Sequence, residues 1–199
     1  MEVETLIVGQ LKTNCYLIYD EESRDAVIVD PGDDAEYIIN KIQDLNLKPQ
    51  FIVATHGHFD HVLAVTELKL AFNIPFLMHK NDLAIYKRTR RTNKYFVGTD
   101  ADPVLDPDIF LKEGDIINNL RVIETPGHTP GSISLYSNNF VFTGDTLFKE
   151  AVGSTEHQYS SPGDLKKSLQ KLIDLPKETT VYPGHGDSTT IEEELSLCL

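Results

Sequence analysis

The segment Thr55-His56-Gly57-His58-Phe59-Asp60-His61 places four potential metal ligands within six residues. It directly follows Phe51-Ile52-Val53-Ala54, an apolar run that predicts a buried strand. Imidazole and carboxylate groups are ligands of zinc and of non-haem iron and manganese. Alternation directs both imidazoles of the His-x-His pair to one side of an extended segment, and Asp60 and His61 follow at the turn into a helix. The segment therefore predicts a metal centre at the end of a strand.

Three further candidate ligands lie in glycine-flanked loops at the ends of predicted strands: His128, Asp145 and His185. Glycine lets the backbone form sharp turns and approach closely at such positions. Five of the seven histidines share this context, whereas His79 and His157 do not and are interpreted as ordinary. Ligand pockets of layered α/β folds form at strand ends, so we expect the five histidines and two aspartates to converge.

The number of candidate ligands favours two metal ions over one. Seven side chains exceed what one tetrahedral zinc can use, and they suit two divalent ions that share a carboxylate and a water. Two such ions with two aspartates and one hydroxide leave a residual charge of about +1, which a partly open pocket tolerates. A structural zinc site is closed and usually contains cysteine, but this sequence has no CxxC motif. We therefore predict a catalytic centre with two divalent ions, zinc first, and iron or manganese as alternatives.

Length and composition predict an ordinary globular protein with one domain over residues 1–199. The 31 acidic against 18 basic side chains give a net charge of −13, which argues against nucleic acid and anionic membranes as partners. No apolar stretch approaches the ~18 residues of a membrane helix, and the N-terminus lacks the features of a secretory signal. We expect Cys15 and Cys198 to be reduced thiols in a cytoplasmic protein.

Apolar runs predict strands, and apolar residues at helical spacing predict helices. The expected strands are 5–8, 15–19, 26–29, 51–54, 75–78, 120–123, 133–136, 140–142 and 180–182, and the expected helices are 35–45, 62–71, 81–88, 164–173 and a short one from about 190. The segment from Tyr86 to Pro107 is rich in turn formers and is expected to be an irregular loop. This order of elements predicts an α/β fold of four layers, with two sheets covered by helices.

Four motifs occur in an order and spacing that resemble the metallo-β-lactamase superfamily: THGHFDH (55–61), TPGHTPGS (125–132), TGDTLF (143–148) and YPGHG (182–186). The opening segment 11–18 resembles the glyoxalase II-like branch of that superfamily, the hydroxyacylglutathione hydrolases. The resemblance covers nearly the whole chain and implies an αββα sandwich with the site at one edge of the two facing sheets. It also implies that one metal takes His56, His58 and His128, that the other takes Asp60, His61 and His185, and that Asp145 bridges them.

The resemblance implies a hydrolase in which a metal-bound hydroxide, held between ions ligated by Asp60 and Asp145, attacks a carbonyl carbon. A thiolate leaves without a proton, whereas an amine needs a general acid, and the motif loops contain no unassigned histidine. We therefore expect a small-molecule thioester as the substrate, with reactive esters and lactones as alternatives. True β-lactamases usually have a cysteine in the second metal set, so Asp145 argues against β-lactam turnover.

Several features of the sequence depart from glyoxalase II. The two-domain enzymes have a C-terminal helical domain that helps bind glutathione, and this chain ends shortly after His185, so we expect that domain to be absent. Family members commonly place Lys or Arg where Ser154 follows Gly153, and Tyr is often found where this chain has Asp187. The basic run Lys87–Lys94 could attract an anionic thioester, but a solvated helix end is the favoured interpretation.

Two other classes of function remain open at this point. Persulfide dioxygenases of the same superfamily use one iron, whose ligands here would be His56, His58, His128 and Asp145. A non-catalytic metal-binding protein would require a defect in the ligand set, and none is visible. Metal analysis and oxygen uptake on glutathione persulfide separate the dioxygenase from the hydrolase.

Overall fold

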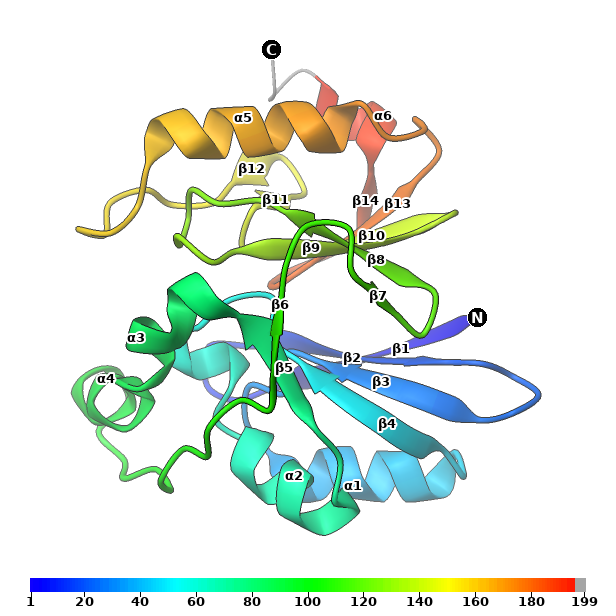
Figure 1. Ribbon diagram of the computed structural model, residues 1–199, viewed down its shortest axis with the longest axis vertical. Helices are drawn as coiled ribbons and strands as arrows, with labels where there is room; N and C mark the ends of the chain where they lie inside the picture. Colours follow the sequence, from blue (N-terminus) through cyan, green and yellow to red (C-terminus); the bar gives the residue numbers. More distant parts are fainter. Residues whose placement is uncertain (196–199) are drawn as a thin grey trace.

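The computed structural model describes residues 1–195 as two facing β-sheets with helices on their outer faces (Figure 1). The first sheet has the order β1-β2-β3-β4-β5-β6: Glu2–Val8, Thr13–Tyr19, Asp25–Val29, Lys48–Val53, Phe76–His79 and Ile109–Leu111. The second has the order β14-β13-β10-β9-β8-β7: Thr189–Thr190, Thr180–Pro183, Phe140–Gly144, Ile133–Ser137, Leu120–Glu124 and Ile116–Ile117. A small sheet pairs β11 (Leu147–Phe148) with β12 (Ala151–Val152). The predicted αββα sandwich is confirmed.

Parallel strand pairs bring the predicted site loops to one edge of the sandwich. Strands β3, β4 and β5 are parallel, and they are connected through α1 (Ala35–Asp44) and α2 (Val65–Phe72). In the second sheet, β10 and β13 are parallel and are connected through α5 (Pro162–Ile173). Because the carboxyl ends of parallel strands share an edge, the loops that follow β3, β4, β10 and β13 start close together.

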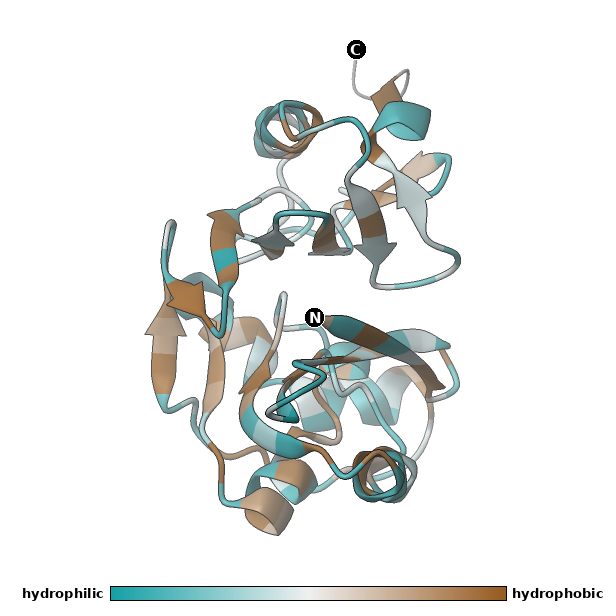
Figure 2. Cartoon of the chain, turned by 90° about the vertical axis from the view of Figure 1, so that its right-hand side faces the viewer, coloured by the Kyte–Doolittle hydropathy of each residue, from teal (hydrophilic) through white to brown (hydrophobic). Residues whose placement is uncertain are grey.

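Three apolar layers hold the sandwich together. The middle layer fills the space between the sheets and includes Val29, Leu135 and Phe142. The outer layers lie under the helices, which combine hydrophobic and hydrophilic residues (Figure 2). Helix α1 buries Ile38 and Ile42, which are four residues apart and therefore lie on one face. Each such side chain contributes about 1.5–3 kcal/mol through burial, so the site loops rest on a rigid base.

The segment 86–107 corrects one expectation. It contains the end of α3 (Leu83–Tyr86) and a further helix, α4 (Thr89–Phe96), where the turn formers had predicted a loop. The Thr89 hydroxyl donates to the Tyr86 carbonyl at 2.6 Å, which satisfies a backbone group at the junction of the two helices. The short final helix α6 (Ile191–Glu194) follows β14, as expected.

Two further expectations concern the cysteines and the membrane. Cys15 is buried in β2, and Cys198 lies outside the described residues. Within residues 1–195, no helix is both long and apolar enough to cross a bilayer.

Candidate metal centre

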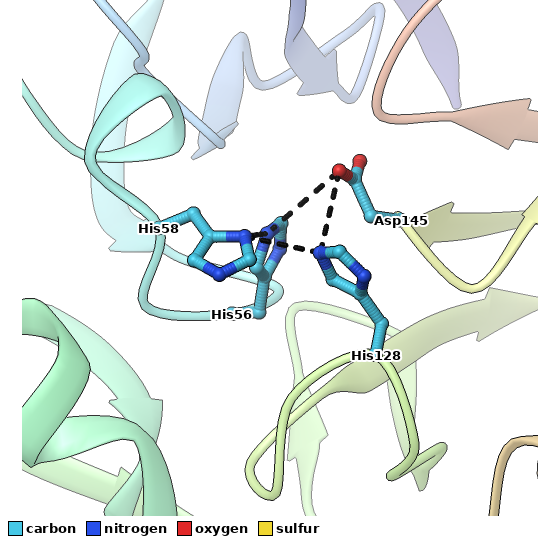
Figure 3. Close-up of side chains that lie close together, drawn as sticks. All are labelled: His56, His58, His128 and Asp145. Carbon is cyan, nitrogen blue, oxygen red and sulfur yellow. Dashed lines mark hydrogen bonds and ion pairs between the residues drawn. The ribbon is translucent and has the colours of Figure 1, made fainter. Parts of the chain in front are cut away.

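All seven predicted ligands meet at the edge where the site loops begin. His56 and His58 come from the loop after β4, and Asp60 and His61 lie in the 3-10 turn that ends this loop. His128 projects from the loop after β8, Asp145 follows β10 directly, and His185 follows β13. Figure 3 shows four of these side chains converging from three separate loops.

The first ligand set consists of His56, His58, His128 and Asp145, whose ligand atoms lie within 4.8 Å of one another. Nδ1 of His58 is 3.0 Å from Nε2 of His56 and 3.0 Å from Nε2 of His128. Asp145 Oδ2 is 3.6 Å from Nε2 of His128 and 4.0 Å from Nε2 of His56 (Figure 3). Three imidazole nitrogens and a carboxylate oxygen therefore face one small volume.

The second ligand set consists of Asp60, His61 and His185, again within 4.8 Å of one another. Asp60 Oδ2 is 3.3 Å from Nε2 of His185 and 3.7 Å from Nε2 of His61. The other oxygen of Asp145, Oδ1, is 3.4 Å from Nε2 of His61. Oδ1 of Asp145 thus faces the second set, while Oδ2 faces the first and also lies 3.8 Å from Nε2 of His185, so the carboxylate lies between the two sets as a shared ligand would.

The proton positions of the five histidines fit metal binding. The outer nitrogen of each ring has its own polar neighbour, so that nitrogen carries the proton and the inner one presents its lone pair to the centre. These neighbours are the Thr55 hydroxyl for His56, the Tyr159 hydroxyl for His58, Asp30 for His61, the Ser154 carbonyl for His128 and the Leu11 carbonyl for His185.

The spacing of these inner atoms also fits. Lone pairs that face each other at 3.0 Å repel unless a cation lies between them. Tetrahedral ligands at zinc–nitrogen distances of 2.0–2.1 Å stand about 3.4 Å apart, which is close to the spacing here. Within residues 1–195, Asp145 Oδ1 is buried and has no hydrogen-bond partner, as expected for an atom reserved for a metal. The residues present therefore fit two divalent ions.

Gly184 makes room for Asp145. A Cβ built at position 184 would overlap Asp145 Oδ1 and lie 2.8 Å from a ring carbon of His61. A side chain here would displace the carboxylate from the place it shares between the sets. Glycine is thus required at position 184 because Asp145 and His61 approach the backbone closely there, and not because of the backbone conformation.

Two buried aspartates outside the predicted ligands hold the site loops. Asp30 accepts from the backbone N–H and the hydroxyl of Thr55, both at 2.7 Å, and from Nδ1 of His61 at 3.0 Å. Asp82 accepts from Gly57 N–H at 2.7 Å, from the Thr129 hydroxyl at 2.6 Å and from Gly131 N–H at 2.6 Å. Asp82 therefore fastens the loop of His56 and His58 to the loop of His128.

Neither aspartate was predicted from the sequence, although the position of Asp30 resembles that of the predicted ligands. Asp30 directly follows an apolar strand, as the ligand loops do. Asp82 stands just before α3, where an aspartate normally indicates a helix cap. Only the three-dimensional arrangement distinguishes it from a cap, because its carboxylate accepts from two other loops.

The two histidines interpreted as ordinary differ in the structure. His79 contacts Glu124 at 3.2 Å through Nε2, outside both ligand sets. His157 also lies outside both ligand sets, but its ring lies 5.2 Å from that of His58 and 5.9 Å from that of His128 between centroids. It stacks on Tyr159 at 5.3 Å and an interplanar angle of 18°. A histidine outside the four motifs therefore lies beside the centre, where a general acid would have to stand.

Electrostatic effects differ between the two sets. Burial lowers the pKa of His58, and neighbouring His128 lowers it further, to about 3. Burial opposes protonation of His185 too, but the hydrogen bond with Asp60 and the charge of Asp145 leave its pKa raised. Burial would raise the pKa of Asp145, yet His61 beside it holds that pKa well below the usual range. A metal-free centre thus has neutral His58, while His185 favours its protonated form.

The comparison with known families agrees with this geometry. The sequence profile described as "Metallo-beta-lactamase superfamily" matches residues 8–185, which include all seven predicted ligands. The chain belongs to the metallo-beta-lactamase superfamily. The resemblance read from the four motifs is confirmed, and members of this superfamily are typically metal-dependent hydrolases that bind divalent ions.

Several characterised members of the superfamily are similar over almost their full length. Hydroxyacylglutathione hydrolase GloC from Haemophilus influenzae is 33% identical, over 98% of this chain and 95% of its own. The B3 metallo-beta-lactamase BLEG-1 is 32% identical with a TM-score of 0.91, covering 98% of this chain and 97% of its own. TTHA1623, solved in a di-iron-bound form, is 36% identical with a TM-score of 0.91 and covers 97% of both chains.

A further solved structure is also similar over almost the whole of this chain. ETHE1 from Myxococcus xanthus is 29% identical with a TM-score of 0.81, and the match covers 98% of this chain and 81% of that one. These relatives share one fold and differ in the reactions and metals in their names. Substrate and metal must therefore be inferred from the side chains of this chain.

Proposed function

We propose that this protein is a dinuclear zinc hydrolase that acts on thioesters, in the manner of a hydroxyacylglutathione hydrolase. The observation that carries the proposal is the completeness of both ligand sets, with Asp145 directed at each. The relation to GloC, at 33% identity, supports a thioester as the substrate class. Reactive esters and lactones are the nearest alternatives.

Two divalent ions supply a water nucleophile at neutral pH and polarise the substrate carbonyl when they are bound. The protein contributes the arrangement of their ligands. Asp30 orients His61 and Asp82 orients the loops of the first set, so the ligand atoms are already converged before substrate arrives. Asp60 Oδ2 accepts from the Thr13 hydroxyl at 3.4 Å, which holds its carboxylate toward His185.

The leaving group decides between substrate classes. A thiolate, whose conjugate acid has a pKa of about 8.5, departs without a proton. The amine leaving group of an amide or a β-lactam requires a proton donor. His157, beside the first set, is the candidate donor to test. Hydrolysis of a thioester needs no proton donor among the side chains around the two sets.

A mononuclear iron dioxygenase is the second candidate, because of the likeness to ETHE1. Its four ligands would be those of the first set alone. The second set is nevertheless complete, with Asp60, His61 and His185 converging as closely as the first. A single iron would leave these three ligands without a metal, and this favours the dinuclear hydrolase, although the one-iron enzymes carry similar motifs.

Elemental analysis and a substrate panel test the proposal. We expect two zinc ions per chain in the purified protein, and hydrolysis of thioesters at higher kcat/KM than of lactones or β-lactams. One iron per chain with oxygen uptake on glutathione persulfide would establish the dioxygenase instead. Faster turnover of a β-lactam than of any thioester would also contradict the proposal.

A further inference from the structure

An open pocket of about 290 Å³ lies beside the first ligand set, between α3 and the segment that leads into α5. Figure 1 shows these two segments on the same side of the molecule, one from each half of the sandwich. Asn81 Nδ2 donates to the Pro130 carbonyl at 3.4 Å and connects the turn before α3 to the loop that carries His128. Tyr159 lines the pocket, and its hydroxyl lies 2.6 Å from Nε2 of His58. One wall of the pocket is therefore a residue in contact with a predicted metal ligand.

One of the five cations of the basic run Lys87–Lys94, Arg88, lines this pocket. Lys87 pairs with Asp106, and Lys94 pairs with Asp100 at 3.1 Å. Arg90 donates from Nε to the Ala101 carbonyl at 2.8 Å. These three cations bind groups in the segment 100–106, which follows α4. Three of the five cations of the run therefore have a structural role.

Arg88 differs from these three. It is exposed, it lines the pocket, and it forms no salt bridge with any residue of the described part of the chain. None of the five guanidinium groups, all within the described residues, forms a salt bridge, so what distinguishes Arg88 is its position in the lining of this pocket. Its planar fork of N–H donors matches a carboxylate and binds it in two places.

The rest of the lining fits a short chain that ends in such a group. Ala84, Ile85 and Pro130 provide apolar surface, while Asn81 and Gln158 add amides to the lining. The volume of about 290 Å³ lies just below the range of about 300–1,000 Å³ for small-molecule sites, so it suits part of a substrate. We propose that this pocket binds a carboxylate carried by the substrate, with Arg88 as the residue that recognises it. The inference rests on the proposed thioester hydrolysis and adds a substrate class to it.

The carboxylate could belong to either half of a thioester, and kinetics distinguish the two sources. The probes are S-acetyl-N-acetylcysteamine, which is neutral, S-glutaryl-N-acetylcysteamine, with the charge on the acyl half, and S-acetyl-3-mercaptopropionate, with the charge on the thiol half. Each is measured with the zinc-loaded wild type, with Arg88→Gln and with Arg91→Gln. Arg91 is the matched control, because it is an exposed cation of the same run that does not line the pocket.

We expect Arg88→Gln to raise the KM of at least one charged probe about tenfold, as for loss of a charge-assisted hydrogen bond, and to leave kcat and the neutral probe unchanged. The half of the substrate that carries the affected charge identifies the source. If each probe had the same KM with Arg88→Gln as with the wild type, the proposal would be overturned. An equal change with Arg91→Gln would also overturn it, since the effect would then come from overall charge.

A binding measurement separates this proposal from the proposed function. The thioether analogue of each charged probe, which cannot be hydrolysed, is titrated calorimetrically into the zinc-loaded protein. Affinity that falls about tenfold in Arg88→Gln supports the pocket even if the wild type hydrolyses no thioester. Affinity that does not depend on Arg88 overturns the pocket, even where thioester hydrolysis is observed.

Discussion

The two ligand sets share Asp145 but are held in different ways. In the first, His56 and His128 are only 1% and 4% exposed, and Asp82 fastens their loops together in the interior. In the second, the side chain of His185 is 29% exposed, and its outer nitrogen reaches the Leu11 carbonyl at 3.2 Å. The second set therefore combines the buried His61 with one ligand, His185, that lies partly at the surface. We expect it to release its metal more readily than the first.

Loss of Asp145 removes what the sets share and should have the largest effect. We expect Asp145→Ala to lower kcat/KM at least ~100-fold and to reduce the metal content at both positions, because its carboxylate lies between the two sets. Elemental analysis and thioester kinetics on the same preparation measure both. His79→Ala is the control and should keep full turnover, since His79 contacts neither set. Full metal content and activity in Asp145→Ala would refute the shared role.

Loss of Asp82 should affect one set alone. We expect Asp82→Ala to weaken metal binding in the first set about 10–100-fold, because three donors from two ligand loops lose their acceptor. Chelator competition should then show early release of one ion and unchanged release of the other. Asp82→Asn keeps the shape of the side chain and provides a folded comparison if the alanine variant is unstable. Equal weakening of both ions would mean that Asp82 supports the fold and not one set.

The convergence of the seven candidate ligands could be predicted from the sequence because each one follows an apolar strand and has a glycine or another candidate ligand beside it. That local pattern is the consequence of a site built at strand ends. Asp82 and Tyr159 could not be found in this way. Asp82 acts through Gly57 and Thr129, which are distant in sequence, and its own surroundings are those of a helix cap.

The fold shows the same limit. Strands and helices with a clear apolar period were predicted, but α4 was not, because Thr89–Phe96 is mostly polar. Tertiary contacts stabilise this helix: Phe96 stacks on Phe59 at 5.9 Å, and Asn93 donates to the Thr99 carbonyl at 2.9 Å. Neither contact can be read from local spacing.

The histidines of the two sets should respond to pH in opposite directions when the metals are removed. His185 has a raised pKa in the folded protein, so its contribution to stability is complete below about pH 6.5 and is lost as pH rises through that raised pKa. The Tm of wild type should therefore exceed that of His185→Gln by about 2–4 °C at pH 6, and the difference should shrink at higher pH.

His58 provides the opposite case. Its pKa is lowered to about 3, so the buried neutral ring costs stability once the unfolded chain takes up a proton below about pH 6.5. The Tm of His58→Gln relative to wild type should thus rise as pH falls from 8 to 5. Thermal unfolding of chelator-treated protein at four pH values measures both variants. Parallel trends in the two variants would show that the sets do not differ electrostatically.

The smallest effect is expected from His157, which touches the first set from outside. With a thioester, His157→Ala should change kcat less than about twofold, because a thiolate leaves without a proton. With an amide or β-lactam probe, any slow turnover should fall further, since an amine needs a general acid. His79→Ala serves again as the matched control. A tenfold loss of thioester kcat in His157→Ala would mean that proton transfer from this side of the centre limits the reaction. His157 would then be a catalytic residue beside the first set.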